Sequence, residues 1–221
     1  MKKPLSEMSS HQRGRSVILL LLAFLLCLTA CDRSAKLNSV SAEKEVARLE
    51  DFQFTEPVQK VLRWKLDLLD QLFQGKQLRA CVENANTENR KLSMQEMLRR
   101  DKDWIEKQQG DLVFQRLITS ECSQKLKTFQ AEYVGYAEIF VTDERGFVVG
   151  LTNLTSDYYQ ADEAWWKRAR QQGEAYMGTM DYDQSSKTQS IAIYKPVRDT
   201  RGHIIGIAKA VISTQHIEAM L

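Results

Sequence analysis

Histidine and proline are scarce in this chain, with three of each among 221 residues. None of His11, His203 and His216 lies at ligand spacing from a cysteine, so the sequence predicts no zinc or other metal site. It also contains no recognisable Ser/His/Asp or Cys/His nucleophile set and no glycine-rich phosphate loop. We therefore expect no catalytic residue, no enzyme activity and no cofactor. The few prolines and the apolar fraction of 43% argue against a disordered chain.

Long apolar runs are also rare, and the one that stands out lies near the N-terminus, at Val17–Leu26. It is followed by small residues and preceded by four basic ones: Lys2, Lys3, Arg13 and Arg15. This is the layout of a secretory signal. The alternative is an uncleaved membrane helix, but Val17–Ala30 is shorter than the roughly 20 apolar residues that span a bilayer.

The end of this segment, Leu28-Thr29-Ala30-Cys31, resembles the lipobox of bacterial lipoproteins. The resemblance implies a signal peptide at residues 1–30, cleavage before Cys31 and a lipid on its thiol. The rest of the chain would then lie in the periplasm, tethered to a membrane. Asp32 resembles an inner-membrane retention signal, and the outer membrane is the alternative.

An excess of basic charge is absent once residues 1–30 are set aside. They hold four basic residues and one acidic residue, which leaves 27 basic and 28 acidic residues and a net charge of −1 in the remaining 191. We therefore expect no nucleic-acid partner.

Cysteines are few as well: Cys27 lies in the predicted signal and Cys31 is the predicted lipid site, which leaves Cys81 and Cys122. In an oxidising compartment this pair predicts a disulfide. It would close a loop of about 40 residues and stabilise the fold by about 3–4 kcal/mol. Two separate buried thiols are the alternative.

A small, polar tether at 31–42 precedes a helical region at 43–134. Apolar residues recur every three or four positions from Val58 to Phe73, between Pro57 and Gly75, which predicts a helix. Ser93-Met94-Gln95-Glu96 is a capping box and predicts a second helix toward Gln109. A third is predicted over 112–129.

After Gly135 the apolar period changes to two, which indicates strands. We predict strands at 136–141, 147–151, 175–182, 190–197 and 204–212, with a helix over 157–172. Asp-x-x-Gly turns at 143–146 and 199–202 join neighbouring strands, and hairpins favour antiparallel pairing. The predicted fold class is α+β, with a long N-terminal helix and further helices packed on a five-stranded antiparallel sheet.

Three segments resemble the extracytoplasmic Cache sensor domains, which are PAS-like: Glu138–Val149, Asp157–Ala169 and Ile193–Gly206. The resemblance covers about residues 135–213. It implies a PAS-like sheet within a sensor domain at 135–221 and a long helix rising from the membrane before it.

One amino-acid-binding Cache subfamily has the motif Tyr-x4-Arg-x-Trp-Tyr-x2-Ala, followed later by Asp. This chain is similar, but Glu163 stands at the Arg position and Trp166 at the second aromatic position. In the subfamily, the Arg and polar neighbours hold the ligand carboxylate and the late Asp holds its amino group. The resemblance implies these ligand-binding residues: Tyr158, Glu163, Trp165, Trp166, Asp181 and Asp183.

The glutamate changes the expected ligand, because Glu163 cannot pair with a carboxylate unless one of the two takes a proton. Carboxylates and aromatic faces attract a cation, at about 0.5–2 kcal/mol per cation–π contact. We therefore expect a small amine or another organic cation. If Arg168 and Lys195 reach the pocket, an anion becomes plausible. The tryptophans could instead be core residues, with Glu163 paired to Lys167 on a solvated helix face.

The expected function is that of a membrane-anchored periplasmic sensor that binds a small molecule. We expect no output module in the chain, so a partner is implied: an inner-membrane receptor, kinase, cyclase or transport system. The alternative is an envelope lipoprotein that binds another protein without a ligand. The sequence leaves a homodimer open.

Overall fold

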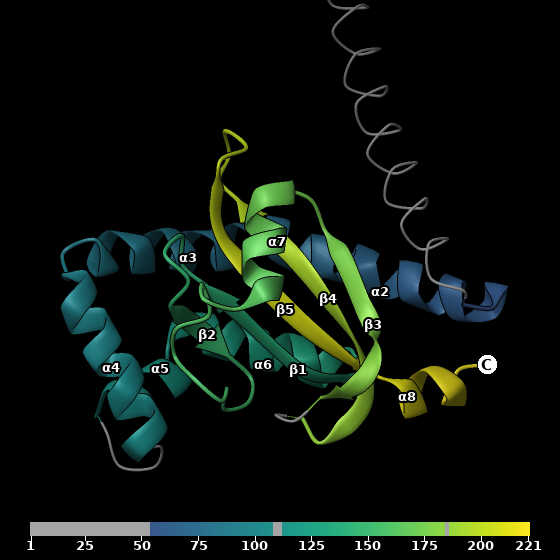
Figure 1. The fold of residues 1–221 in the computed structure, drawn as a ribbon. Helices are drawn as coiled ribbons and strands as arrows, with labels where there is room; N and C mark the ends of the chain where they lie inside the picture. The colour runs from purple at the N-terminus through teal and green to yellow at the C-terminus, as the bar shows by residue number, and fades with distance from the viewer. Residues whose placement is uncertain (1–53, 108–111, 184–185) are drawn as a thin grey trace, which may run out of the picture. The chain divides into compact units, whose positions relative to one another are not determined.

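The computed structural model describes residues 54–107, 112–183 and 186–221. The predictions for the signal peptide, Cys31 and the tether lie outside these residues. The compact unit Arg48–Leu221 contains both the helices and the sheet. Its helices before the sheet are α2 (Glu56–Gln74), α3 (Lys76–Asn89), α4 (Met94–Lys107), α5 (Leu112–Ile118) and α6 (Glu121–Glu132) (Figure 1).

The sheet has five antiparallel strands in the order β2-β1-β5-β4-β3. The strands are β1 (Tyr136–Thr142), β2 (Val148–Leu151), β3 (Tyr176–Asp183), β4 (Thr188–Arg198) and β5 (Ile204–Ser213). Helix α7 (Ala164–Gln172) follows β2, and α8 (Thr214–Ala219) follows β5. The α+β class, the five antiparallel strands and the PAS-like arrangement predicted from the sequence are confirmed.

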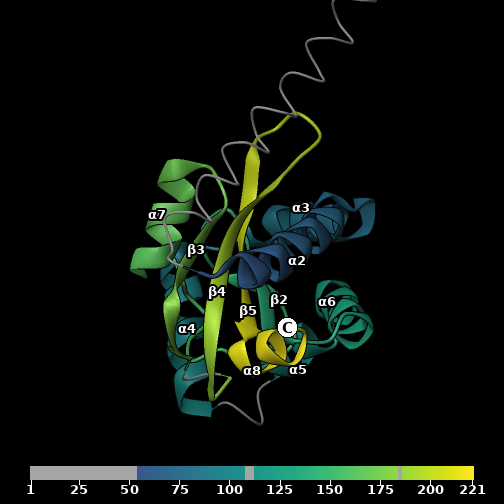
Figure 2. The ribbon, with the colours of Figure 1, turned by 90° about the vertical axis from the view of Figure 1, so that its right-hand side faces the viewer.

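The sheet separates two layers of helices. Helices α2, α3 and α6 cover one face, and α7 lies on the other (Figure 2). The main core fills the first layer, where Leu62, Leu69 and Leu126 meet Ile139 and Ile193. A second cluster joins α4 and α5 to β1 and β2, and a third places α7 on the central strands. No helix of the described residues is long and apolar enough to cross a membrane.

A disulfide between Cys81 and Cys122 joins α3 to α6, with the two Cα atoms 5.6 Å apart. Helix α6 also lies close to β2 at Gly150. A Cβ atom there would stand 2.6 Å from the Cβ of Cys122. Glycine therefore permits the close approach of helix and strand at this point.

Two predicted helices differ in the structure. The helix predicted over 112–129 is two helices, because Ser120 starts a new one and its Oγ accepts a hydrogen bond from the Ser123 backbone N–H at 3.2 Å. The helix predicted over 157–172 begins only at Ala164. The backbone N–H groups of Tyr158 and Tyr159 donate to Asp101 of α4 and so do not enter a helix.

Candidate functional site

A cavity of about 170 Å³ opens between β3, β4 and β5. It contains Asp181 and Asp183, two of the residues singled out in the sequence. The residues that line it are Gly178, Thr179, Asp181, Tyr182, Asp183, Ser190, Ala192, Tyr194 and Lys209.

Tyr194 lines this cavity, and two further aromatic rings pack against it. Trp165 of α7 stacks on Tyr194 of β4, with ring centroids 5.1 Å apart and planes 18° apart. Tyr176 of β3 lies 4.7 Å from Tyr194, and its hydroxyl donates to the Trp165 carbonyl at 2.8 Å. The hydrogen bond and the stacking together fix α7 over the end of the site, because each joins the helix to a different strand.

Two of the lining residues form an ion pair. Lys209 Nζ and Asp183 Oδ1 are 3.1 Å apart, and their side chains are only 15% and 14% exposed. The same ammonium lies 5.7 Å from the centroid of the Phe140 ring. Lys209 therefore already makes, within the chain, the carboxylate and aromatic contacts that an external amine would seek.

Negative charge prevails around Tyr194. Its pKa is raised first by burial, and then by Tyr176 and by the carboxylates of Asp183, Glu163 and Asp181. The phenol therefore stays neutral at physiological pH. The three carboxylates of Asp183, Glu163 and Asp181 face two cations, Lys209 and the Arg168 guanidinium over Tyr176, so these five side chains leave a local charge of about −1.

The structure divides the six predicted ligand-binding residues. Asp181 and Asp183 line the cavity and Trp165 lies over Tyr194. Glu163 precedes α7, exposed, and caps the helix with its backbone only.

Trp166 and Tyr158 lie apart from this cavity. Trp166 is buried under α7, where its Nε1 donates to Thr142 Oγ1 at 2.9 Å. Tyr158 is buried between Trp104 and Phe147, with ring centroids 5.7 and 5.5 Å from its own. Both side chains pack in the core. For Trp166 this agrees with the alternative given from the sequence, in which the tryptophans are core residues.

Of the two cations that could have favoured an anionic ligand, Lys195 lies apart from the cavity, whereas Arg168 lies beside the aromatic rings next to it. Lys195 pairs with Asp70 of α2 at 2.6 Å, on the face of the sheet that α2, α3 and α6 cover. The Arg168 guanidinium lies 4.2 Å from the Tyr176 ring centroid, and its side chain belongs to an exposed residue of α7. The residues that sequence reasoning missed are Tyr176, Tyr194 and Lys209. A lysine inside the apolar strand 204–212 was the available signal.

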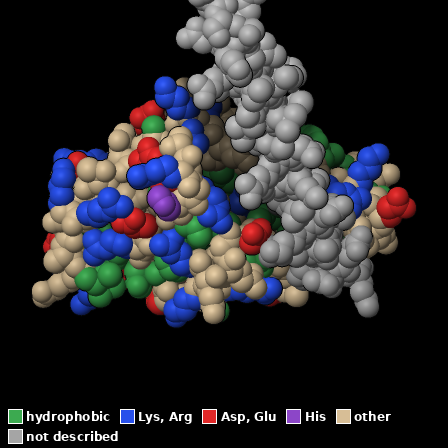
Figure 3. All heavy atoms as spheres, turned by 90° about the horizontal axis from the view of Figure 1, so that it is seen from above, with side chains coloured by type: hydrophobic (Ala, Val, Ile, Leu, Met, Phe, Trp, Pro, Cys, Tyr) green, Lys and Arg blue, Asp and Glu red, His purple; other side chains and the backbone are tan. Residues whose placement is uncertain are grey.

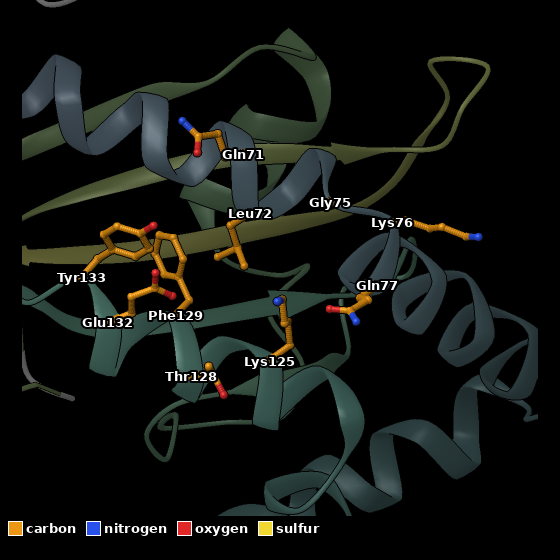
Figure 4. A pocket seen from close by; sticks show the side chains of 10 residues that line it. All are labelled: Gln71, Leu72, Gly75, Lys76, Gln77, Lys125, Thr128, Phe129, Glu132 and Tyr133. Atoms are coloured by element: carbon orange, nitrogen blue, oxygen red, sulfur yellow. The ribbon is translucent and has the colours of Figure 1, made fainter.

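A second hollow, of about 400 Å³, lies on the opposite side of the sheet between α2, α3 and α6. Figure 4 shows Leu72 pointing from α2 toward Phe129 and Lys125 of α6, whereas Lys76 extends away. It contains none of the residues singled out in the sequence. The side chains that line this hollow carry charges of both signs, because Lys125 and Glu132 are among them.

Charge on the outer surface is mixed. On the face in Figure 3, Lys and Arg side chains stand among Asp and Glu rather than in one unbroken patch. Exposed side chains of opposite character also pair locally, such as Arg90 with Glu144 at 2.6 Å and the imidazole of His203 with Asp199 at 3.1 Å. Among the described residues, no group of three or more His, Cys, Asp or Glu side chains is placed to hold a metal ion.

No family model matches the chain, and no curated protein matches it. Among solved structures, it is similar to the ligand-binding domain of the Campylobacter jejuni chemoreceptor Tlp3 in complex with L-norvaline. The identity is 20% and the TM-score 0.38, over 75% of this chain and 63% of that one. The ligand-binding domain of the Pseudomonas aeruginosa amino-acid chemoreceptor PctC, in complex with GABA, is 15% identical at a TM-score of 0.37, over 65% and 62%.

An extracellular ligand binding receptor from Desulfohalobium retbaense is 14% identical at a TM-score of 0.38, over 65% of this chain and 25% of that one. The chain thus spans less than two thirds of the length of each of these three proteins. Similarity at this level assigns no ligand to the chain.

Proposed function

We propose that this protein is an extracytoplasmic sensor of the Cache type that binds a small organic cation in the cavity lined by Tyr194, Asp181 and Asp183, next to Trp165. Its role is binding rather than catalysis. A lipid on Cys31 anchors it to the membrane, and an inner-membrane receptor, kinase, cyclase or transport system carries its signal onward.

The observation that supports this proposal is the set of carboxylates around a neutral phenol, under a stacked tryptophan. Aromatic faces and carboxylates attract the same ligands, because both offer negative electrostatic potential to a cation. The volume of about 170 Å³ suits an amine of few heavy atoms rather than a peptide. Tyr158 and Trp166 are not part of the proposed site, because both are packed in the core.

The ion pair to Lys209 shapes the way a ligand would bind. An incoming ammonium either shares Asp183 with Lys209 or displaces it, while Asp181 is exposed and open to a direct contact. The ligand therefore competes with a tethered amine. We expect modest affinity and a preference for compact primary amines, which resemble the lysine head group.

Titration calorimetry of the full chain against a panel of small amines, amino acids and carboxylic acids tests this proposal. We expect heat from amines and a weaker response in Asp181→Asn, by up to about fivefold, because an exposed ion pair contributes about 0.2–1 kcal/mol. Asp67→Asn, an exposed aspartate on α2, is the matched control. Binding confined to carboxylic acids contradicts the proposal.

The anchor and the partner need separate tests. Intact-mass measurement of the protein from the membrane fraction should give a chain that starts at Cys31 and carries lipid. An unmodified N-terminus would rule out the anchor. Pull-down from membranes should recover an inner-membrane signalling or transport protein.

The alternative is a protein-interaction module without a ligand. It is favoured by the edge strand β3, where Met180 and Tyr182 are 54% and 45% exposed. An unpaired strand edge with exposed apolar side chains is a site where another chain can pair. A thermal-shift panel that is flat for all small molecules, together with a partner whose binding is lost in Tyr182→Ser, would favour this alternative.

A further inference from the structure

Lys65 of α2 is fully buried, with a relative exposure of 0%. Its ammonium donates to the carbonyl of Val134, in the turn between α6 and β1. It lies between two rings, 4.8 Å from the Trp64 centroid and 4.6 Å from the Tyr136 centroid. No carboxylate among the described residues pairs with it. The aromatic faces and one carbonyl therefore hold a positive charge that is not neutralised.

His216 of α8 shares this site. Its Nε2 is buried and has no hydrogen-bond partner within the described part of the chain. The ring packs on Gly135, where a Cβ atom would stand 1.9 Å from the imidazole Cδ2. Burial lowers the pKa of His216, and the charge of Lys65 lowers it further. The docked position of α8 thus accommodates a neutral imidazole.

We propose that Lys65 and His216 form a proton-operated latch, in which protonation of His216 releases α8 from α2 and from the α6–β1 turn. A second positive charge beside the buried ammonium would have no counter-ion, so the docked state disfavours it. Release places the imidazolium in water and removes the repulsion. Neutral pH therefore holds α8 in place and acid pH frees it.

The other polar groups around the pair do not offset this repulsion. Tyr136 of β1 donates its hydroxyl to the Lys65 carbonyl at 2.7 Å, and burial raises its pKa, so it supplies no negative charge. Glu132, at the end of α6, has an exposed side chain that hydrogen-bonds with the hydroxyl of Tyr133 and raises the pKa of that hydroxyl. On α8 itself, Glu218 is exposed and is not among the groups that shift the pKa of His216. The β4 and β5 residues packed on this side, Ile191 and Ile212, are apolar.

Helix α8 connects directly to the strands that carry the candidate cavity. Thr214 Oγ1 donates to the carbonyl of Gln189 in β4 at 3.1 Å, and the next residue, Ser190, lines the cavity. The Ser213 N–H donates to the Gly135 carbonyl at 3.1 Å. Undocking α8 breaks the first of these bonds and loosens the end of β5. The latch itself does not depend on whether that cavity binds a ligand.

Hydrogen exchange on the full chain at pH 7.5 and pH 5.0, corrected for the intrinsic effect of pH, tests the latch. We expect α8 to exchange faster at the lower pH, by up to about 30-fold, because an imidazole with a pKa of 6.5 is neutral in about one molecule in 30 at pH 5.0. His216→Gln should remove the response. His203→Gln is the matched control, because His203 is exposed on the β4–β5 turn and pairs with Asp199.

The NMR titration of the His216 ring is a second test, and its first part uses the wild-type protein. Its NMR titration midpoint should lie below 6.5 in the wild type and rise toward 6.5 in Lys65→Met, which removes the neighbouring charge. A wild-type midpoint at or above 6.5 overturns the proposal. So does exchange of α8 that is equal at both pH values, or that quickens equally in His216→Gln.

Discussion

The buried ammonium of Lys65 should make the stability of the fold depend on pH in the alkaline range. Burial lowers the pKa of Lys65 from 10.5 to about 8. Between these values the unfolded chain holds a proton that the folded chain has released. Since stability rises with pH wherever the unfolded state binds more protons, the free energy of unfolding should increase from about pH 8 toward pH 10.5. Below pH 8 both states carry the proton, and this contribution is flat.

The size of the effect follows from the two pKa values. One pKa unit corresponds to 1.36 kcal/mol, so raising the pH from 7.0 to 9.5 should add about 2 kcal/mol to the free energy of unfolding through Lys65 alone. Lys65→Met removes the titrating group and should abolish this gain. Lys60→Met is the matched control, because Lys60 is exposed on the same helix, and it should retain the wild-type dependence.

Urea unfolding of the three proteins, followed by tryptophan fluorescence at half-unit steps of pH, measures the difference. Comparing the variants cancels the contributions of groups that they share, including the tyrosines whose pKa values are raised by burial. A wild type and a Lys65→Met variant with parallel curves between pH 7.0 and 9.5 would refute the reasoning. The ammonium would then be hydrated in the folded state.

Three further predictions concern the helical layer. Replacing both Cys81 and Cys122 by Ala should lower the free energy of unfolding by about 4 kcal/mol, because the disulfide closes a loop with a sequence separation of 41; a loss below about 1 kcal/mol in urea unfolding would contradict this estimate. Gly150→Ala should cost about 1–3 kcal/mol through the clash with Cys122, and an unchanged melting temperature would show that α6 moves freely away from β2. Ser120→Ala should cost about 1 kcal/mol by removing the cap of α6, and Ser120→Thr should recover most of it in the same assay.

The strands were predictable because their apolar period is local and strong. Helix α3 was not predicted, because Gly75 has the character of a helix end and few apolar residues follow it: Leu78, Cys81 and Val82. In the structure the backbone of Gly75 is extended, and this residue is both the C-cap of α2 and the N-cap of α3. A single residue therefore separates the two helices. Sequence spacing cannot distinguish a stop from a turn between two helices.

The segment 157–163 shows a different limit. Its composition favours a helix, yet Asp101, more than 50 residues earlier, accepts hydrogen bonds from the N–H groups of Tyr158 and Tyr159 at 2.8 Å. Phe147 also pairs with Tyr159 as an isolated bridge. These long-range bonds satisfy donors that a helix would otherwise use. Local propensity is overridden because a buried N–H group needs one good acceptor, whichever element supplies it.

The candidate site follows the same rule. A motif could indicate Trp165, Asp181 and Asp183, since their spacing is a property of the sequence. It could not indicate that Lys209 reaches Asp183, because that contact depends on β4 lying between β5 and β3. A charge count alone gives an acidic site, whereas the strand order supplies an internal cation. In the proposed function, the ligand preference depends on two contributions: local motif spacing provides the carboxylates, and sheet topology decides which of them already has a partner.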